Sequence, residues 1–241
     1  MSSKSDKINK KTDKKSKSTI KKDLPGNNHQ SISKKTEVIS DSKYHEKKIK
    51  SEKLYQIIQD KSVNHIYFYN KYIDNKSVES LRTQLSSYNN IIPGTMLNKN
   101  IRLWSTPTPI MLHVHCPGGE VDAGLAAMKL VYNSKIPIIT VVDGLAASAA
   151  TYMCMVSSLR MINPHGHMLI HQPTNNFPIK GKFQNIEDKY LRIKKYMKTL
   201  TQIYKNYSNL KDNTLKEILS QDIYMDANTC KKYGLVDKIL E

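Results

Sequence analysis

Ser148 lies among small residues in the segment Gly144–Ala150, whose sequence is Gly-Leu-Ala-Ala-Ser-Ala-Ala. The segment follows an apolar run that predicts a β-strand, and its alanines predict the start of a helix. Small neighbours leave room for a substrate beside the hydroxyl, and the positive end of a helix dipole favours negative charge that develops nearby. The pattern is typical of a nucleophilic serine, but also of a closely packed helix in which Ser148 merely bonds a local carbonyl.

His171 ends a second apolar run and stands just before a turn, in the sequence Ile-His-Gln-Pro at 170–173. An imidazole in this position suits a general base, although a half-buried structural histidine is the alternative. Four other histidines complicate this assignment, namely His113, His115, His165 and His167. Zinc uses such sets, but no cysteine or carboxylate joins them at ligand spacing, so we predict no metal site.

The third segment is His-Cys-Pro-Gly-Gly at 115–119, between a predicted strand and a predicted helix. Two successive glycines let the backbone turn sharply and present N–H groups that no side chain covers. Such groups suit an oxyanion or a phosphate, and the alternative is a plain strand-to-helix turn.

These segments need a framework of strands and helices to bring them together. We expect strands at His65–Tyr69, Ile110–His115, Ile136–Val142 and Met168–Ile170. We expect helices at Val78–Tyr88 after a capping Ser77, at Val121–Asn133 and at Ala146–Ser157. Short apolar runs that alternate with amphipathic stretches indicate an α/β domain.

The C-terminal third is predicted to be mainly helical. Apolar residues recur at steps of three and four over Ile186–Tyr207, which predicts one long amphipathic helix. Short helices are expected at Thr214–Ser220 and Ala227–Tyr233, the second with Asp226 as its N-cap and Gly234 as its C-terminal stop.

Charge divides the chain into a tail and a body. The net charge is +17, and the first 50 residues hold 15 lysines against six acidic residues, with apolar residues only singly. We therefore predict a disordered Lys-rich tail over 1–52 and one domain over 53–241. A basic arm for nucleic acid is the alternative, but the tail has no arginine and almost no aromatic residue, so nucleic acid is not the expected partner.

The chain is expected to act in the cytoplasm. Its longest nearly apolar stretch, 145–156, is too short for a membrane-spanning helix, and the Lys-rich N-terminus lacks the apolar core of a secretory signal. The three cysteines, Cys116, Cys154 and Cys230, are an odd number spread widely, which disfavours a disulfide framework.

Four motifs occur in one order: Pro-Gly-Gly at 117–119, Gly-x-Ala-Ala-Ser at 144–148, Ile-His-Gln-Pro at 170–173 and Tyr-Gly-Leu-Val-Asp at 233–237. In this order they resemble ClpP, the proteolytic subunit family of the Clp protease. The resemblance extends over about residues 64–240. It implies the ββα superhelix of the ClpP/crotonase folds, with the long helix as a protruding handle.

The resemblance also implies roles for single residues. Ser148 matches the family's nucleophile, His171 its general base, and Asp222, by its spacing back from Tyr233, the acid that orients the base. Asp143 and Asp226 are rival acids, although Asp226 is already accounted for as a helix cap. The backbone N–H groups of Gly119 and Ala149 would form the oxyanion hole.

The family's assembly and partners follow as expectations. The resemblance implies a ring or double ring of identical chains that acts on unfolded polypeptide, supplied by a Clp ATPase. That partner alone would use ATP, and this chain would need no cofactor. A peptidase that works without a Clp ATPase, a catalytically silent scaffold subunit and a crotonase-type acyl-CoA enzyme stay open as alternatives.

Several positions depart from the family pattern. The connection 89–109 is longer than usual, Cys116 stands where a serine is common, and Ala149 replaces a methionine. Ile223 follows Asp222 where many members have an arginine that links rings, which bears on the coupling between rings.

Overall fold

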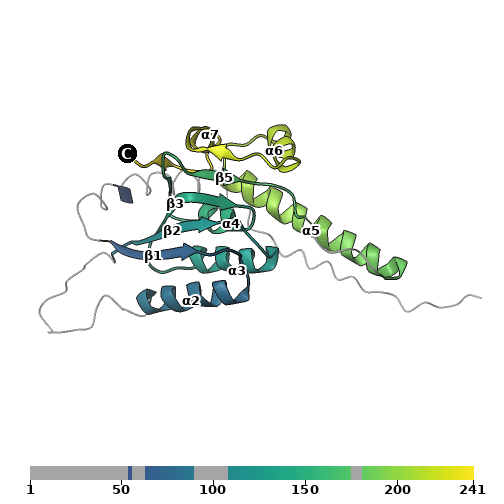
Figure 1. The fold of residues 1–241 in the computed structure, drawn as a ribbon, viewed down its shortest axis with the longest axis horizontal. Helices are drawn as coiled ribbons and strands as arrows, with labels where there is room; N and C mark the ends of the chain where they lie inside the picture. The colour runs from purple at the N-terminus through teal and green to yellow at the C-terminus, as the bar shows by residue number, and fades with distance from the viewer. Residues whose placement is uncertain (1–53, 56–62, 90–107, 175–180) are drawn as a thin grey trace, which may run out of the picture. The chain divides into compact units, whose positions relative to one another are not determined.

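Parallel β-strands form the centre of the fold (Figure 1). The computed structural model describes residues 54–55, 63–89, 108–174 and 181–241. The main sheet has the order β1-β2-β3-β4-β7, and every pair in that row is parallel. Its strands are β1 Asn64–Tyr69, β2 Ile110–Cys116, β3 Ile138–Ala147, β4 Leu159–Ile162 and β7 Lys238–Ile239. This architecture confirms the α/β class predicted from the alternating pattern.

The long strand β3 changes partners along its length. Its first half pairs with β4, whereas Leu145–Ala147 pair with β5, which spans His167–Leu169. A bulge at this change of partner shifts the register to β2 between Val114 and Cys116. Gly144 lies in the bulge, where a Cβ would be only 2.7 Å from the His115 ring. The bulge redirects the end of β3 toward β5.

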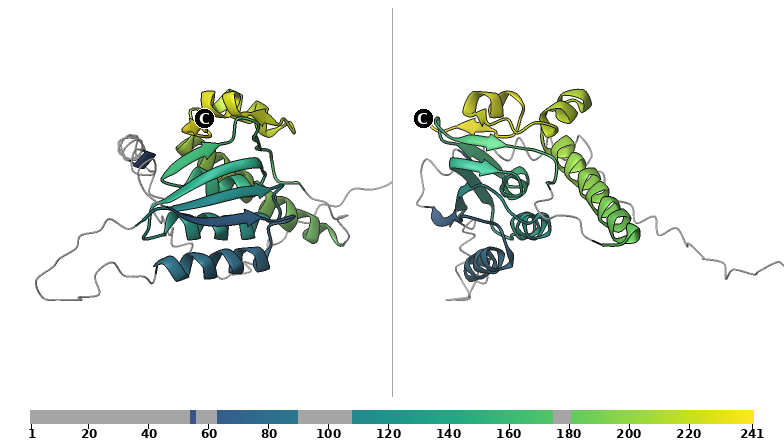
Figure 2. Two further views of the ribbon diagram at one scale, coloured as in Figure 1. Left: turned by 60° about the vertical axis from the view of Figure 1, so that its left-hand side comes forward. Right: turned by 45° about the vertical axis from the view of Figure 1, so that its right-hand side comes forward.

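Helices α2 (Asn75–Asn89), α3 (Val121–Tyr132) and α4 (Ala150–Met155) lie on one side of the sheet (Figures 1 and 2). They bury the main core against alternate residues of β1 and β2, including Ile66, Phe68, Leu112 and Val114. The intervening residues of β1 point away, so Tyr67 and Tyr69 are more than half exposed. A smaller cluster on the other face joins Leu54 to residues of β3 and β4.

Helix α5 (Phe183–Tyr207) is buried only near its C-terminal end. There Leu200, Ile203, Tyr204 and Tyr207 enter the core, whereas the N-terminal half exposes Phe183, Ile186, Tyr190 and Leu191. The helix extends beyond the sheet (Figures 1 and 2). The C-terminal part is completed by helix α6 (Asp212–Leu219), the two-residue strand β6 (Met225–Asp226) and helix α7 (Ala227–Lys232).

Some predicted boundaries are wrong, for identifiable reasons. The helix expected from Ala146 begins only at Ala150, because β3 continues to Ala147 by pairing with β5. Strand pairing here overrides the helix propensity of alanine. Ser77 does not cap α2, because the helix begins at Asn75 and Ser77 lies in its first turn. Asp74, just before the helix, accepts from the Ser77 N–H at 2.8 Å, and the Ser77 hydroxyl accepts from the Asp74 N–H at 3.0 Å.

The two predictions about the ends of α7 are confirmed. Asp226 caps α7 by accepting from the Thr229 N–H at 2.7 Å, and Gly234 ends that helix with a φ of +68°. All three cysteines are buried and unpaired. No helix in the described part of the chain is long and apolar enough to cross a membrane. The predicted tail, 1–52, and most of the 89–109 connection lie outside the described residues.

A nearly buried ion pair joins β4 to the last turn of the chain. The Arg160 side chain is 5% exposed, and its guanidinium donates to both carboxylate oxygens of Asp237. The same group also donates to the carbonyls of Tyr207 and Gly234. Arg160 therefore fastens the ends of α5 and α7 to the sheet, which accounts structurally for the aspartate of the Tyr-Gly-Leu-Val-Asp motif.

Removing the acid of this pair should be costly, because the charged Arg160 guanidinium then stays buried without the Asp237 carboxylate that neutralises it. We expect Asp237→Ala to lower the free energy of unfolding by about 3 kcal/mol in urea titrations. The control is Asp212→Ala, whose partner Lys205 is 39% exposed and which should change stability by less than about 1 kcal/mol. Equal effects of the two substitutions would contradict this role of Arg160.

Candidate active site

Ser148 has an unusual backbone conformation at the point where β3 turns into α4. Its φ of 53° lies in the left-handed region, and it is the one non-glycine residue with positive φ in the described part of the chain. The Ser148 N–H donates to the Leu169 carbonyl of β5 at 2.8 Å. Its carbonyl accepts from the Thr151 N–H at 3.0 Å and from the Thr151 hydroxyl at 2.6 Å. A tight, strained turn of this kind directs the side chain out of the strand.

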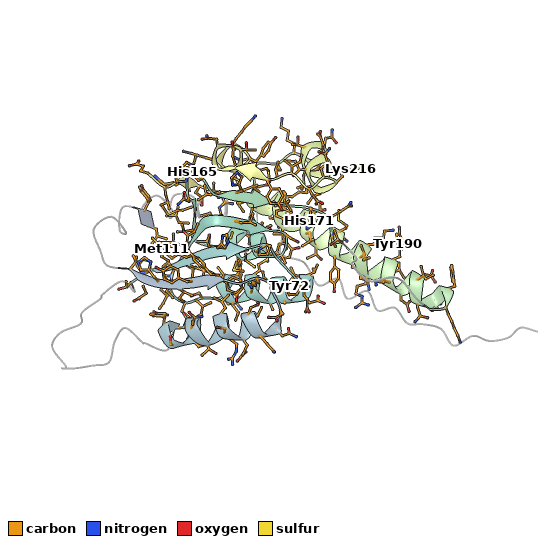
Figure 3. All side chains as sticks on the ribbon, viewed as in Figure 1. Tyr72, Met111, His165, His171, Tyr190 and Lys216 are labelled. Atoms are coloured by element: carbon orange, nitrogen blue, oxygen red, sulfur yellow. The ribbon has the colours of Figure 1, made fainter. Side chains whose placement is uncertain are left out.

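His171 lies two residues after the end of β5 (Figure 3). Its Nε2 lies 2.8 Å from the Ser148 Oγ. Ala147 pairs with Leu169 in parallel register. The chain segments that follow these two residues therefore lie side by side, which brings Ser148 close to His171. The imidazole is 17% exposed, so most of the ring is shielded from water.

Asp222 completes a hydrogen-bonded chain of three side chains. Its Oδ1 lies 2.7 Å from the His171 Nδ1. The Gln172 N–H donates to the Leu219 carbonyl at 2.8 Å, which holds the end of α6 and the loop that follows it against the end of β5. The Asp222 side chain is 73% exposed and is the outermost of the three.

This geometry defines what the three side chains are able to do. A carboxylate only accepts hydrogen bonds, so Nδ1 carries the proton and Nε2 presents its lone pair to the serine hydroxyl. An imidazole in this orientation is able to take the Ser148 proton while the oxygen attacks an electrophilic carbon.

The glycine loop packs directly against the Ser148 turn. Gly118 has a φ of +104°, and a Cβ there would lie 2.8 Å from the Ser148 Cβ and 2.7 Å from the Ala147 carbonyl oxygen. Ile73 holds the loop from outside, since its N–H donates to the Gly118 carbonyl and its own carbonyl accepts from the Glu120 N–H. Only glycine fits such a close approach at this φ.

Two backbone N–H groups beside Ser148 have no hydrogen-bond acceptor among the residues that the structure describes. Neither Gly119 nor Ala149 donates a backbone hydrogen bond to any described residue. The Gly118 N–H, by contrast, is directed to the Cys116 Sγ at 3.5 Å. Burial raises the pKa of the Cys116 thiol, which keeps this sulfur neutral in its packing role.

The other predicted candidates lie in different environments. Asp143 accepts from the Tyr69 hydroxyl, which raises the pKa of Tyr69 to about 12, and it pairs with the His113 Nδ1 at 2.8 Å. Asp226 is occupied as the cap of α7. His165 lies well apart from His171 (Figure 3). Across the described ranges, no three potential metal ligands come together.

Two residues that bear on the site were not singled out from the sequence. They are Thr151, whose hydroxyl bonds the Ser148 carbonyl, and Tyr204 of α5, which bonds Thr151. The only signal for Thr151 is a hydroxyl residue three positions after the serine, where a bond back to the first carbonyl is common. Nothing local marks Tyr204, because it is 53 residues away from Thr151 in the sequence.

Comparison with known proteins agrees with the fold. The family model described as Clp protease matches residues 49–241, so the chain belongs to the Clp protease family. The ATP-dependent Clp protease proteolytic subunit 1 of Chlamydia pneumoniae is 33% identical over 134 residues, which are 55% of this chain and 70% of that protein. The corresponding subunit of Deinococcus radiodurans is 31% identical over 134 residues, 55% of this chain and 65% of the relative.

A solved structure supports the fold independently. A ClpP1 mutant from Listeria monocytogenes has a TM-score of 0.61 to this chain at 20% sequence identity. The superposition covers 78% of this chain and 96% of that one. The resemblance inferred from the four motifs is therefore confirmed at the level of family and fold.

The close approach of Gly118 to Ser148 generates a test. We expect Gly118→Ala to slow the labelling of Ser148 by a fluorophosphonate at least about tenfold, because the added methyl group must displace the loop or the serine turn. Intact mass spectrometry over time measures the rate, and circular dichroism checks the fold.

The matched control for this test is Gly181→Ala. Gly181 also has a positive φ, +138°, but the described atoms nearest to a Cβ there belong to the Asn185 side chain, at 3.1 Å, and not to the Ser148 turn. The rate at which Ser148 is labelled in Gly181→Ala should stay within about twofold of the parent rate. Equal rates for Gly118→Ala and the parent would contradict the packing argument.

Proposed function

We propose that this chain is a serine endopeptidase that hydrolyses peptide bonds of unfolded polypeptides through an acyl-enzyme. The observation that carries the proposal is the connected set Ser148 Oγ, His171 Nε2, His171 Nδ1 and Asp222 Oδ1, with distances of 2.8 and 2.7 Å. Its occurrence in a chain of the Clp protease family supports peptide hydrolysis as the reaction.

In the acylation step, the Ser148 oxygen attacks the carbonyl carbon of the peptide bond while His171 takes the hydroxyl proton. Asp222 holds the ring in the required tautomer and stabilises the imidazolium. The carbonyl oxygen becomes an oxyanion, and the N–H groups of Gly119 and Ala149 are the donors we assign to it. An alanine in place of methionine leaves this backbone donor intact.

Collapse of the tetrahedral intermediate breaks the C–N bond, and His171 returns its proton to the leaving amine. A water molecule then attacks the ester of Ser148, again with His171 as the base, and frees the serine. Every proton is carried by these side chains, so the reaction requires no cofactor in this chain.

Two alternatives from the sequence are less well supported. A catalytically silent scaffold subunit would have no need for three polar side chains joined in the order that nucleophilic catalysis requires. A crotonase-type acyl-CoA enzyme shares the fold class, but the match to the Clp protease model over 49–241 favours the peptidase.

Partners and compartment also belong to this proposal. We assign the chain to a homo-oligomeric ring or double ring, and an ATPase that unfolds substrates is the expected partner, because its relatives are named as subunits of an ATP-dependent protease. A peptidase that works without that ATPase stays the alternative, and Ile223 at the position of the usual ring-linking arginine bears on the coupling between rings. Three unpaired buried thiols fit the reducing cytoplasm.

The chemistry is tested by removing each side chain in turn. Ser148→Ala should abolish fluorophosphonate labelling and lower hydrolysis of a fluorogenic peptide by at least about 10³-fold, and His171→Ala should have a similar effect. Asp222→Asn should lower kcat by about 10²- to 10⁴-fold, because the imidazole loses the acceptor that orients it.

Control variants for this set are Ser87→Ala and His165→Ala, both at exposed positions outside the site. They should retain full activity. Undiminished peptide hydrolysis by Ser148→Ala would refute the proposed function, whereas full loss in His165→Ala and none in His171→Ala would reassign the base.

Assembly is tested on α5, whose exposed half carries Ile186 and Tyr190, 43% and 61% exposed. Apolar side chains on a projecting helix need a partner surface. We expect native mass spectrometry to give a multimer, and Ile186→Asp with Tyr190→Asp to lower its mass. Lys198→Asp, at an exposed position of the same helix, is the control. A parent protein that is monomeric at micromolar concentration would overturn the assignment.

A further inference from the structure

Two buried hydroxyl groups connect helix α5 to the backbone of Ser148. The Thr151 Oγ1 lies 2.6 Å from the Ser148 carbonyl oxygen and 2.7 Å from the Tyr204 hydroxyl. Ser148 lies directly after β3, Thr151 is in α4, and Tyr204 is in the buried end of α5. The proposed catalytic steps make no use of Thr151 or Tyr204.

The direction of each hydrogen bond in this connection is determined by chemistry. A carbonyl oxygen only accepts, so the single Thr151 hydroxyl proton points to the Ser148 carbonyl. The Thr151 oxygen is then an acceptor, and the Tyr204 hydroxyl donates to it. Tyr204 thereby fixes the rotamer in which Thr151 donates to Ser148.

Both side chains lie where water does not compete with these bonds. Thr151 and Tyr204 are each 0% exposed. Burial also raises the pKa of Tyr204 well above its usual value, so the phenol keeps the proton it donates at any working pH. Hydrogen bonds in such surroundings are stronger than at the surface, and a lost partner leaves a costly unsatisfied group.

We propose that Tyr204, acting through Thr151, is a positioning residue that holds the Ser148 turn in the geometry needed for attack. This inference rests on the proposed function of Ser148. The turn has a φ of 53°, which an unsupported serine does not favour. Relaxation of the turn would swing the Ser148 oxygen away from His171, and small displacements of a nucleophile cost large factors in rate.

Another tyrosine of α5 provides a comparison within the same helix. The Tyr196 hydroxyl donates to the Asp122 Oδ2 of α3 at 2.6 Å, so it also ties α5 to a neighbouring helix. That bond does not touch the Ser148 turn. General loosening of α5 would make Tyr196→Phe and Tyr204→Phe act alike, whereas positioning of the serine would respond to Tyr204→Phe and not to Tyr196→Phe.

The experiment compares Tyr204→Phe, Thr151→Val, Thr151→Ser and the double variant Thr151→Val with Tyr204→Phe. We expect Tyr204→Phe and Thr151→Val to lower kcat and the fluorophosphonate labelling rate at least about tenfold with KM within about twofold, because substrate binding groups are untouched. Thr151→Ser keeps the hydroxyl and should restore most of the rate.

The double variant tests whether the two hydroxyls act in series. If Tyr204 acts only through Thr151, the double variant should be no slower than Thr151→Val alone. If the fold-losses of the two single variants multiply in the double variant, Tyr204 does not act through Thr151. Rates within twofold of the parent for both single variants would also overturn the inference. Tyr196→Phe is the control and should keep the parent rates.

Hydrogen exchange of the Ser148 amide, whose N–H donates to Leu169, tests positioning without any activity. Tyr204→Phe and Thr151→Val should accelerate this exchange about tenfold or more, and Tyr196→Phe should not. If the parent hydrolyses no peptide, the proposed function fails while exchange still decides the role of Tyr204. If the parent is labelled at Ser148 and neither rate nor exchange responds to Tyr204→Phe, this inference fails alone.

Discussion

The left-handed backbone of Ser148 is the constraint on which the rest of the site depends. A non-glycine residue with a φ of 53° costs about 1–2 kcal/mol relative to ordinary backbone. Three contacts hold it: the Leu169 carbonyl on its N–H, Thr151 on its carbonyl, and a glycine at position 118 that leaves space for its Cβ. The turn directs the hydroxyl toward His171, and the surrounding elements hold this strained backbone in place.

The change of partner along β3 explains how the two main groups meet. Pairing with β4 anchors the first half of the strand in the sheet. Pairing with β5 brings His171, which follows that strand, close to Ser148. The segment after β5 then binds the end of α6, because the Gln172 N–H donates to the Leu219 carbonyl. Asp222 is the outermost member because it comes from that loop and not from a strand of the sheet.

Helix α5 joins two parts of the molecule that differ in character. Its exposed N-terminal half carries apolar side chains, and its buried end contributes Tyr204 to the core. The rings of Tyr204 and Tyr152 lie 6.4 Å apart in an edge-on arrangement, and Arg160 binds the Tyr207 carbonyl at the end of the helix. These contacts give the projecting helix a rigid base beside the Ser148 turn.

The sequence by itself determined the class of fold, the positions of Ser148 and His171 at the ends of apolar runs, and the family, because these depend on local patterns and on the order of short motifs. Asp222 followed only from its spacing to a later motif, since an exposed loop carries no periodic signal. Only the tertiary structure decided that β3 runs on to Ala147, that Arg160 pairs with Asp237, and that Tyr204 reaches Thr151. Each of these depends on hydrogen bonds between residues more than 20 positions apart, and local propensity does not encode such bonds.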